Sequence, residues 1–279
     1  MNYPASQQQY DIYWRKLRAS AKDHPANRFR YHLILEVLRN EAADAKTILD
    51  FGCGDGVLLE KIRASFPHVQ LYGCDISAEQ IEQNRKVLPG IEFFQADAAS
   101  QDLALQVKTH SLPKFDLIIS SEVVEHIQDD RTFLFNAVNL LKSGGLFLVT
   151  TQSGPRYRMD TEVLGHLRHY RLADFRKMVE GAGLRVVRDA SCGFPVLTLQ
   201  KKLVELFFGL VMRQLSPGDA QGPGHAHHSS DEGAPRVVGM IRSAIVKAIM
   251  DAMYWAMRVS PKLGGPQLFV LAEKPDRPS

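Results

Sequence analysis

Three glycines at alternate positions, Gly52, Gly54 and Gly56, follow an apolar run whose last residue is Asp50. Glycine adopts positive φ without steric cost and lets a ligand lie against bare backbone. The apolar pattern then resumes at helical spacing, and the first N–H groups of a helix have no partner within the helix. This strand, turn and helix predict a cradle for a nucleotide-like ligand. The carboxylate of Asp50 would repel a pyrophosphate and favours a ligand with a cationic group.

Two further acidic residues, Asp75 and Asp97, follow the next two apolar runs. Ligands of open α/β sheets bind outside the carboxyl ends of the strands, so we expect these residues and Asp50 to converge on one crevice. Asp75 comes about 20 residues after the turn, where a carboxylate can accept hydrogen bonds from both ribose hydroxyls. Taken singly, each acidic residue is also explained as a helix cap or turn former. A nicotinamide enzyme would carry G-x-G-x-x-G, whereas this turn reads G-x-G-x-G and contains Asp55.

Carboxylates and imidazoles form a second group that could do chemistry. Glu122, Glu125 and His126 lie in an E-x-x-E-H run, and His166 and His169 follow later. An imidazole can remove a proton from a nucleophile, so His126, His166 and His169 are candidate bases. The alternative divalent-metal set that this pattern indicates is Glu122, Glu125, His126 and His169. A third interpretation is that Glu125 and His126 only order their loop by hydrogen bonds.

The composition is that of an ordinary globular protein. The 279 residues are enough for one sizeable α/β domain with additions, and the net charge of +3 gives no reason to expect nucleic acid. Three cysteines match no zinc or disulfide spacing. Neither a signal peptide nor a run of about 18 apolar residues is visible. We therefore expect a cytoplasmic protein, with peripheral contact to a membrane left open.

Strand and helix patterns alternate through the middle of the chain, which predicts a mostly parallel sheet covered on both faces. Strands are predicted at Thr47–Asp50, Gln70–Cys74, Ile91–Gln95, Phe115–Ser120, Leu146–Thr151, Leu184–Asp189 and Pro266–Ala272. The helices between them are expected at Val57–Ser65, from Ser77, at about Asp130–Leu141 with a glycine stop at Lys142–Gly145, and at 172–182. The predicted organisation is an N-terminal helical cap (1–44), a core (45–193), a helical insertion (194–262) and a last strand with a tail (263–279).

Helices are also predicted outside the alternating core. Two of them, Tyr10–Ala21 and Asn27–Asn40, precede the sheet and either pack on it or form a lid over the ligand. In the insertion, helical patterns at Val196–Leu215 and Val237–Val259 flank a polar stretch, 216–235, which we expect to be a mobile loop. The helix over 237–259 is strongly amphipathic. Its apolar face is expected to pack on the core, to form a homodimer, or to contact a membrane surface.

Several ordered motifs together resemble class I S-adenosylmethionine-dependent methyltransferases, including the small-molecule and quinone O-methyltransferase branch. The motifs are ILDFGCGDG, GCDIS, QADA, FDLIISSEVVEHI and LLKSGGLFLVTT, and the resemblance covers Thr47–Asp189 and the last strand. It implies a Rossmann-like, doubly wound sheet of seven strands whose last strand is antiparallel and inserted between strands five and six. The E-x-x-E-H arrangement also resembles that of small-RNA 2′-O-methyltransferases and quinone O-methyltransferases.

The resemblance assigns roles to the residues at the glycine turn and the strand ends. Gly52 and Gly54 would pass the methionine part of S-adenosylmethionine close to the backbone, and Asp50 would lie near its ammonium group. Asp75 would hold the ribose hydroxyls and Ile76 would pack on the adenine. The remaining implied contacts are Asp97 and Ala98 at the adenine edge, and Ser120 and Glu122 near the sulfonium.

The resemblance therefore implies transfer of a methyl group from S-adenosylmethionine. Because the transfer is an in-line displacement, a hydroxyl acceptor must be aligned and must lose its proton. We expect methylation of an oxygen on a small-molecule, sugar or lipid-linked acceptor. The alternatives are metal-assisted RNA 2′-O-methylation, which the lack of a dense basic face disfavours, and a partner subunit that binds the cofactor without catalysis.

Overall fold

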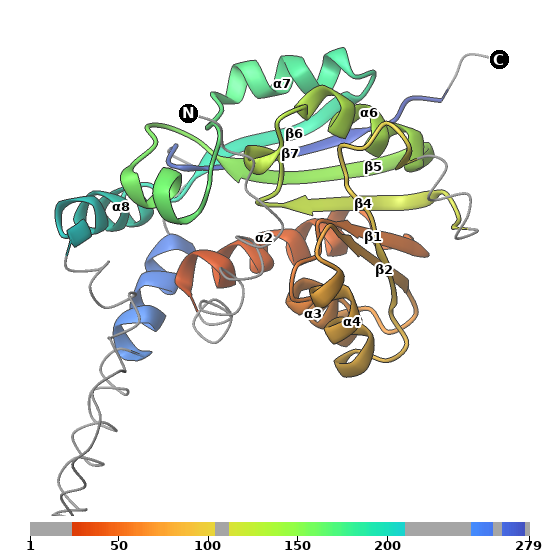
Figure 1. Ribbon diagram of the computed structural model, residues 1–279, viewed down its shortest axis with the longest axis horizontal. Helices are drawn as coiled ribbons and strands as arrows, with labels where there is room; N and C mark the ends of the chain where they lie inside the picture. Colours follow the sequence, from red (N-terminus) through yellow and green to blue (C-terminus); the bar gives the residue numbers. More distant parts are fainter. Residues whose placement is uncertain (1–23, 104–111, 210–246, 259–263, 277–279) are drawn as a thin grey trace, which may run out of the picture.

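The computed structural model describes residues 24–103, 112–209, 247–258 and 264–276 (Figure 1). Within these ranges one seven-stranded sheet has the order β3-β2-β1-β4-β5-β7-β6. The strands are β1 (Thr47–Phe51), β2 (Gln70–Asp75), β3 (Glu92–Gln95), β4 (Phe115–Ser121), β5 (Leu141–Gln152), β6 (Arg185–Cys192) and β7 (Gln267–Glu273). The helices are α2 (Pro25–Glu41), α3 (Val57–Ser65), α4 (Ala78–Val87), α6 (Asp130–Leu140), α7 (Leu172–Gly181) and α8 (Val196–Leu206). Residues 247–258 are also helical.

The strands from β3 to β5 run parallel, whereas β7 lies between β5 and β6 and is antiparallel to both. This topology confirms the predicted doubly wound sheet and the inserted antiparallel last strand. Because β1, β2 and β4 are parallel neighbours, the residues that follow them meet at one edge of the sheet.

Two apolar layers attach the helices to the two faces of the sheet. Ile48 of β1 packs in a layer with α2, α3 and α4, whereas Leu49 belongs to the layer of α6 and α7. Figure 1 shows these two sets of helices on opposite sides of the sheet. Successive side chains of a strand point to opposite faces, so a strand covered on both sides is apolar at nearly every position. Phe51 stacks on Phe133 with 5.2 Å between the ring centroids, which places α6 beside the carboxyl end of β1.

Two strands extend beyond their predicted limits. The predicted helix of about Asp130–Leu141 agrees with α6, which ends at Leu140. Strand β5, however, begins at Leu141 rather than at Leu146, so Lys142–Gly145 belong to the strand. The N–H of Gly144 donates to the carbonyl of Lys274, so the chain after β7 pairs with this segment. Similarly, β6 continues past Asp189 to Cys192, which pairs with Gln267. The start of β5 at Leu141 pairs with Phe115 of β4, and the added end of β6 pairs with β7. Both partners lie outside the local pattern of the strand that they pair with.

The N-terminal and inserted helices are described in part. Helix α2 starts at Pro25 because the His24 side chain accepts the N–H of Ala26 and proline has a φ suited to a first helical turn. A small apolar cluster that includes Leu197 and Met257 joins α2, α8 and the helix of 247–258. The predicted helix over 10–21, the loop 216–235 and parts of both predicted insertion helices lie outside the described residues. None of the described helices is long and apolar enough to cross a membrane.

Candidate active site

The glycine turn after β1 is fixed to the end of β2. Gly52, Gly54 and Gly56 all have positive φ, at 92°, 49° and 72°. The N–H groups of Gly52 and Cys53 donate to the carbonyl of Cys74 at 2.9 and 2.8 Å. A Cβ atom on Gly52 would lie 2.5 Å from Cγ2 of Val123, in the segment after β4. Glycine is therefore required at this position both by its conformation and by the close approach of a neighbouring segment.

Asp50 carries a buried carboxylate beneath this turn. It is 2% exposed, and among the described residues none forms a hydrogen bond with its Oδ1 atom. Burial, and then the nearby charges of Asp75 and Asp55, raise the pKa of Asp50 to about 8. A buried acid with two acidic neighbours and an unused oxygen is expected to bind a cation. The prediction of a ligand with a cationic group thus fits the structure.

The end of β2 presents a second carboxylate and an apolar surface. Oδ2 of Asp75 accepts the N–H of Gly54 at 2.9 Å, and Oδ1 accepts the N–H of Ser77 at 3.0 Å. A carboxylate oxygen has two lone pairs, so each of these atoms can accept more than one hydrogen bond. The neighbouring Ile76 is 41% exposed, unusual for a large apolar residue and suited to packing on a flat base. Asp97 follows β3 with an exposed side chain, and Oδ1 accepts the N–H of Ala99.

Arg30 of α2 is a site residue that the sequence did not reveal. It is 8% exposed, and within the described part of the chain its buried Nε has no hydrogen-bond partner. Its guanidinium lies 3.6 Å from Oε2 of Glu122, so α2 passes over the carboxyl end of β4. The adjacent Tyr31 lies close enough to Asp50 and Asp55 for their charges to act on it, although burial is the main cause that raises its pKa to about 12. No pattern in the sequence distinguishes Arg30 from the nearby Arg28.

Glu122 is held in a strained conformation at the end of β4. Its φ is 60°, a left-handed value that is costly for a residue with a side chain. Its carboxylate accepts hydrogen bonds from the side-chain amides of Gln152 and Gln267, the latter at 2.6 Å. Ser120, which precedes it, is fully buried and donates to the carbonyl of Phe51 at 3.0 Å. Side chains from α2, β5 and β7 therefore meet at one carboxylate.

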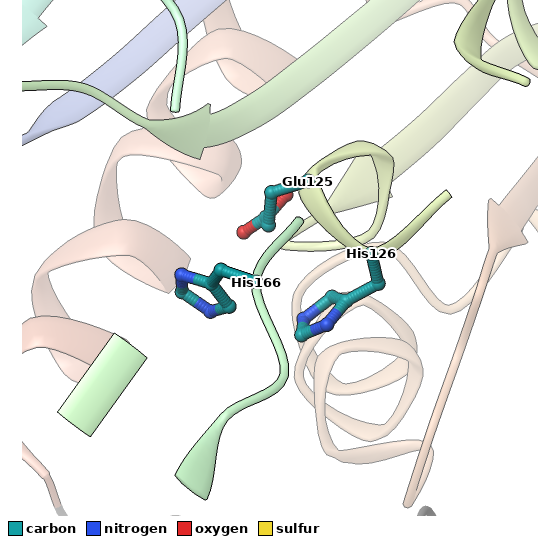
Figure 2. Close-up of side chains that lie close together, drawn as sticks. All are labelled: Glu125, His126 and His166. Atoms are coloured by element: carbon teal, nitrogen blue, oxygen red, sulfur yellow. The ribbon is translucent and has the colours of Figure 1, made fainter. Parts of the chain in front are cut away.

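Figure 2 shows a cluster of a carboxylate and two imidazoles, formed by Glu125, His126 and His166. Glu122 lies close enough for its charge to act on Glu125. Glu125, His126 and His166 each offer a ligand atom, and these atoms lie within 4.8 Å of one another. Glu125 is fully buried; its Oε2 accepts the hydroxyl of Thr151 at 2.8 Å, while Oε1 has no partner among the described residues. Burial, with the charge of Glu122 second, raises the pKa of Glu125 well above its usual range. The 3₁₀ turn η1 (Val124–His126) carries the first two members of the cluster.

Hydrogen bonds fix the tautomers of His166 and His169. Nδ1 of His169 lies 3.3 Å from the carbonyl oxygen of Gly154, which can only accept. Burial lowers the pKa of both histidines, to about 2 for His166, so both rings are neutral at physiological pH. Nε2 of neutral His169 then accepts a hydrogen bond from Nδ1–H of His166, at 3.0 Å. Nε2 of His166 is consequently left as an acceptor.

Asp160 lies behind these two rings, in the single π-helical turn η2 (Met159–Val163). It is 2% exposed, and its carboxylate oxygens lie 3.8 and 3.9 Å from the nearest ring nitrogens of His166 and His169. Lys201 of α8 compensates its charge at 2.8 Å. The structure thus groups Glu125 and His126 with His166, and places His169 with Asp160. Glu122, predicted in the metal set, faces Arg30 and the two glutamines instead.

A sequence model of the family described as "Methyltransferase domain" matches residues 14–189, which include the glycine turn, Asp75, Glu122 and the histidine cluster. The chain belongs to the class I S-adenosylmethionine-dependent methyltransferases. It is 30% identical over 125 residues to the trans-aconitate 2-methyltransferase of Azoarcus sp. (strain BH72), covering 44% of this chain and 46% of that protein. It is 37% identical over 106 residues to the ubiquinone biosynthesis O-methyltransferase of Chelativorans sp. (strain BNC1), covering 37% of this chain and 39% of that protein.

The methyltransferase spans less than half the length of either relative in these matches. Over nearly its whole length it shares its fold with the plantazolicin methyltransferase BamL. The TM-score is 0.56 at 12% identity, and the match covers 98% of this chain and 92% of that one. The donor is therefore S-adenosylmethionine, and the orphaned oxygen of Asp50 together with the glycine turn is suited to its cationic end.

Proposed function

We propose that this methyltransferase moves the methyl group of S-adenosylmethionine to an oxygen of a small-molecule, sugar or lipid-linked acceptor. The observation that carries the proposal is the position of a buried carboxylate and neutral imidazole cluster beside Glu122, at the edge of the sheet that holds the glycine turn. A hydroxyl is a poor nucleophile until its proton is removed or its oxygen is bound to a metal, and this cluster is suited to that task. An O-methyltransferase among the relatives agrees with this proposal.

The cofactor-binding residues have proposed roles that follow from their positions. Gly52 and Gly54 let the methionine part lie against the backbone, and Asp50 pairs with its ammonium group. The buried guanidinium of Arg30 binds its carboxylate. Asp75 accepts the ribose hydroxyls, and Ile76 packs on the adenine. Asp97 and Ala98 lie at the adenine edge, and the bound cofactor supplies an electrophilic methyl group near Ser120 and Glu122.

The reaction type is testable with a cofactor labelled with carbon-13 in its methyl group. The enzyme is incubated with pooled small-molecule and lipid fractions, and the labelled product is examined by NMR. A methoxy or methyl ester carbon supports the proposal, because its chemical shift differs from that of an N-methyl or C-methyl carbon. Transfer only to nitrogen or carbon would contradict O-methylation while leaving the methyltransferase assignment intact.

Binding of S-adenosylmethionine is expected to strengthen as pH rises from about 6 towards 7.5. With a pKa of about 8, Asp50 is mostly protonated in the free enzyme, whereas an ammonium group beside it favours the carboxylate. Binding then releases a proton, and the affinity rises by up to about tenfold per pH unit below pH 8. Calorimetric titration across this range measures the slope.

Two controls isolate the contribution of Asp50. Asp50→Asn should bind with little pH dependence, and so should wild type with methylthioadenosine, which lacks the ammonium group. An unchanged slope in Asp50→Asn would assign the proton to another group.

A divalent metal bound by Glu125, His126 and His166 is a second candidate feature. The unused Oε1 of Glu125 and the acceptor Nε2 of His166, whose tautomer is fixed by His169, favour it. Metal-binding histidines typically have their second nitrogen fixed by such a hydrogen bond. General bases work best with a pKa near the operating pH, and burial holds the pKa of His166 and His126 at about 2 and about 4. A cation at this position would lower the pKa of an acceptor hydroxyl bound to it.

Replacing Glu125 by glutamine is expected to weaken Mn²⁺ binding by about tenfold or more, since a charged ligand is lost. Calorimetry on enzyme stripped with chelator gives the affinity. Glu122→Gln is the comparison variant, because Glu122 lies outside the cluster although its charge acts on Glu125, so its substitution should weaken Mn²⁺ binding less than Glu125→Gln does. Equal losses in both variants would restore the ligand set expected from sequence, and no measurable binding to wild type would remove the metal.

We further propose peripheral contact with a lipid surface. Helix α8 and the residue that follows it expose an apolar stripe, formed by Leu199, Leu203, Leu206 and Phe207, which are 46–72% exposed. In the helix of 247–258, Trp255 is 56% exposed, with the guanidinium of Arg258 over its ring. Exposed apolar side chains beside cations and an interfacial aromatic residue are typical of a surface that meets anionic lipid.

The double variant Leu203→Glu/Leu206→Glu is expected to lose about tenfold or more in binding to vesicles of phosphatidylglycerol and phosphatidylcholine, since burying each leucine contributes about 1.5–3 kcal/mol. Co-sedimentation measures the bound fraction. Phe135→Glu on α6, which changes an equally exposed apolar residue away from the stripe, should bind as wild type does. Unchanged binding of the double variant would refute lipid contact, and conversion of a dimer to a monomer would instead assign the stripe to a second copy.

A further inference from the structure

A cavity lies between the loop after β5 and helix α8, and neither the proposed cofactor contacts nor the metal cluster accounts for it. Its volume is about 240 Å³, enough for a ring with one or two substituents. The lining includes Ser153, Pro155 and Tyr157 from the loop, Thr198 and Lys201 from α8, and Pro266 before β7. The lining therefore combines flat apolar groups with three hydroxyls and one ammonium group.

The cavity begins where the proposed cofactor site ends. Ser153 and Pro266 adjoin Gln152 and Gln267, the two glutamines that hold Glu122, and the N–H of Ser153 donates to the carbonyl of Pro266. The carbonyl of Gly154, another lining residue, accepts a hydrogen bond from Nδ1–H of His169. A molecule in the cavity would thus contact the segments that carry both Glu122 and the histidines.

The charges around the cavity favour an anion. The side chain of Lys201 is 23% exposed and contacts Asp160 at 2.8 Å, and because an ammonium group has three donors, this contact leaves capacity for a ligand. The carboxylate of Asp160 compensates the charge of Lys201, and the carboxylate of Glu205 compensates the charge of Arg158. Arg156 adds a further positive charge beside the histidines, where its guanidinium donates to the carbonyl of Leu167. The charges named here therefore sum to +1, and Lys201 is the one of them that lines the cavity.

We propose that this cavity binds the methyl acceptor, and that the acceptor is a ring-sized group bearing a carboxylate or phosphate. The ring packs among Tyr157, Pro155 and Pro266, whose flat side chains suit a planar or chair-shaped ring better than a flexible chain. The anionic group binds the ammonium of Lys201. The inference rests on the proposed function, since it identifies the class of molecule on which the enzyme acts.

Fluorine NMR titration with model anions tests the inference without knowledge of the natural acceptor. The probes are 4-fluorobenzoate and 4-fluorophenyl phosphate, with 4-fluorobenzyl alcohol as the uncharged probe. Wild type should bind at least one anion about tenfold more tightly than the alcohol, and Lys201→Met should remove that preference. Lys202→Met, which changes the next and exposed lysine of α8, is the matched control and should keep it. The stronger of the two anions identifies the carboxylate or the phosphate as the recognised group.

Further measurements separate a binding effect from a folding effect. Lys201→Met leaves Asp160 buried without its cation, so Lys201→Met/Asp160→Asn is examined as well; it should fold like wild type and still lack the anion preference. Binding of S-adenosylmethionine is measured on every sample. Wild type that binds the cofactor but shows no preference for either anion would overturn the inference alone, whereas loss of cofactor binding in wild type would overturn the proposed function. Retention of the anion preference in the double variant would also overturn the inference.

Discussion

Replacing Gly52 by alanine is expected to abolish binding of S-adenosylmethionine and to lower the free energy of unfolding by about 2–5 kcal/mol. The φ of 92° is strained for any residue with a Cβ atom, and that atom would lie 2.5 Å from Cγ2 and 2.9 Å from Cγ1 of Val123. Val123 belongs to the segment between Glu122 and the histidine cluster, so the collision moves both halves of the site. Chemical denaturation and calorimetric titration measure the two effects.

Gly181→Ala is the control for this change. No atom lies within 4 Å of a Cβ built on Gly181, and its φ is not positive. Because alanine is preferred to glycine in helices, this variant should be as stable as wild type or more stable by up to about 1 kcal/mol. A Gly52→Ala protein that binds the cofactor normally would show that the turn is less confined than its geometry indicates.

Replacing Asp75 by alanine should weaken cofactor binding by about 100-fold or more. The carboxylate holds the turn through the N–H of Gly54 and orders the start of α4 through the N–H of Ser77. In the proposed complex it also accepts both ribose hydroxyls, and hydrogen bonds to a charged group each contribute about 1.5–3 kcal/mol. Calorimetric titration with the demethylated product measures the loss without turnover.

Asp116→Ala distinguishes loss of binding from loss of stability. Asp116 also accepts backbone N–H groups, from Lys46 and Thr47, and pairs with Lys142 at 2.7 Å, but it lies at the opposite end of the parallel strands. This variant should unfold more easily and bind the cofactor as tightly as wild type. Similar binding losses in the two variants would indicate a general effect of stability rather than a contact with the ribose.

The sequence predicts the core of the fold because the signals there are local. Glycine spacing, apolar runs and a Ser77 cap lie within a few residues of the elements they define, and the predicted helix Val57–Ser65 has the bounds observed for α3. The strand limits that differ are the start of β5 at Leu141, which pairs with Phe115 of β4, and the end of β6 beyond Asp189, which pairs with β7. Pattern alone does not contain that pairing; the family resemblance supplied it.

The site residues could likewise be predicted only where a local pattern or the sheet topology places them. The residues at the carboxyl ends of parallel strands were identifiable because topology places them together. The grouping of the histidines was not, since it depends on the path of the η2 turn, which places Asp160 rather than Glu122 beside His169. Arg30 and Gln267 were missed because an arginine in a helix and a glutamine at a strand start have no distinguishing local pattern; only their burial marks them.

The position of β7 determines when the site can form during synthesis. Gln267 bonds to Glu122, and β7 fills the space between β5 and β6, yet it is made after the other six strands of the sheet. Until it arrives, β5 and β6 each have an unpaired edge, a known route to aggregation of nascent chains. The glycine turn, by contrast, is complete once β4 has been made. A growing chain can therefore recognise the methyl donor well before it can hold Glu122 in place, so donor binding is expected to stabilise the nascent half of the protein while it waits for its last strand.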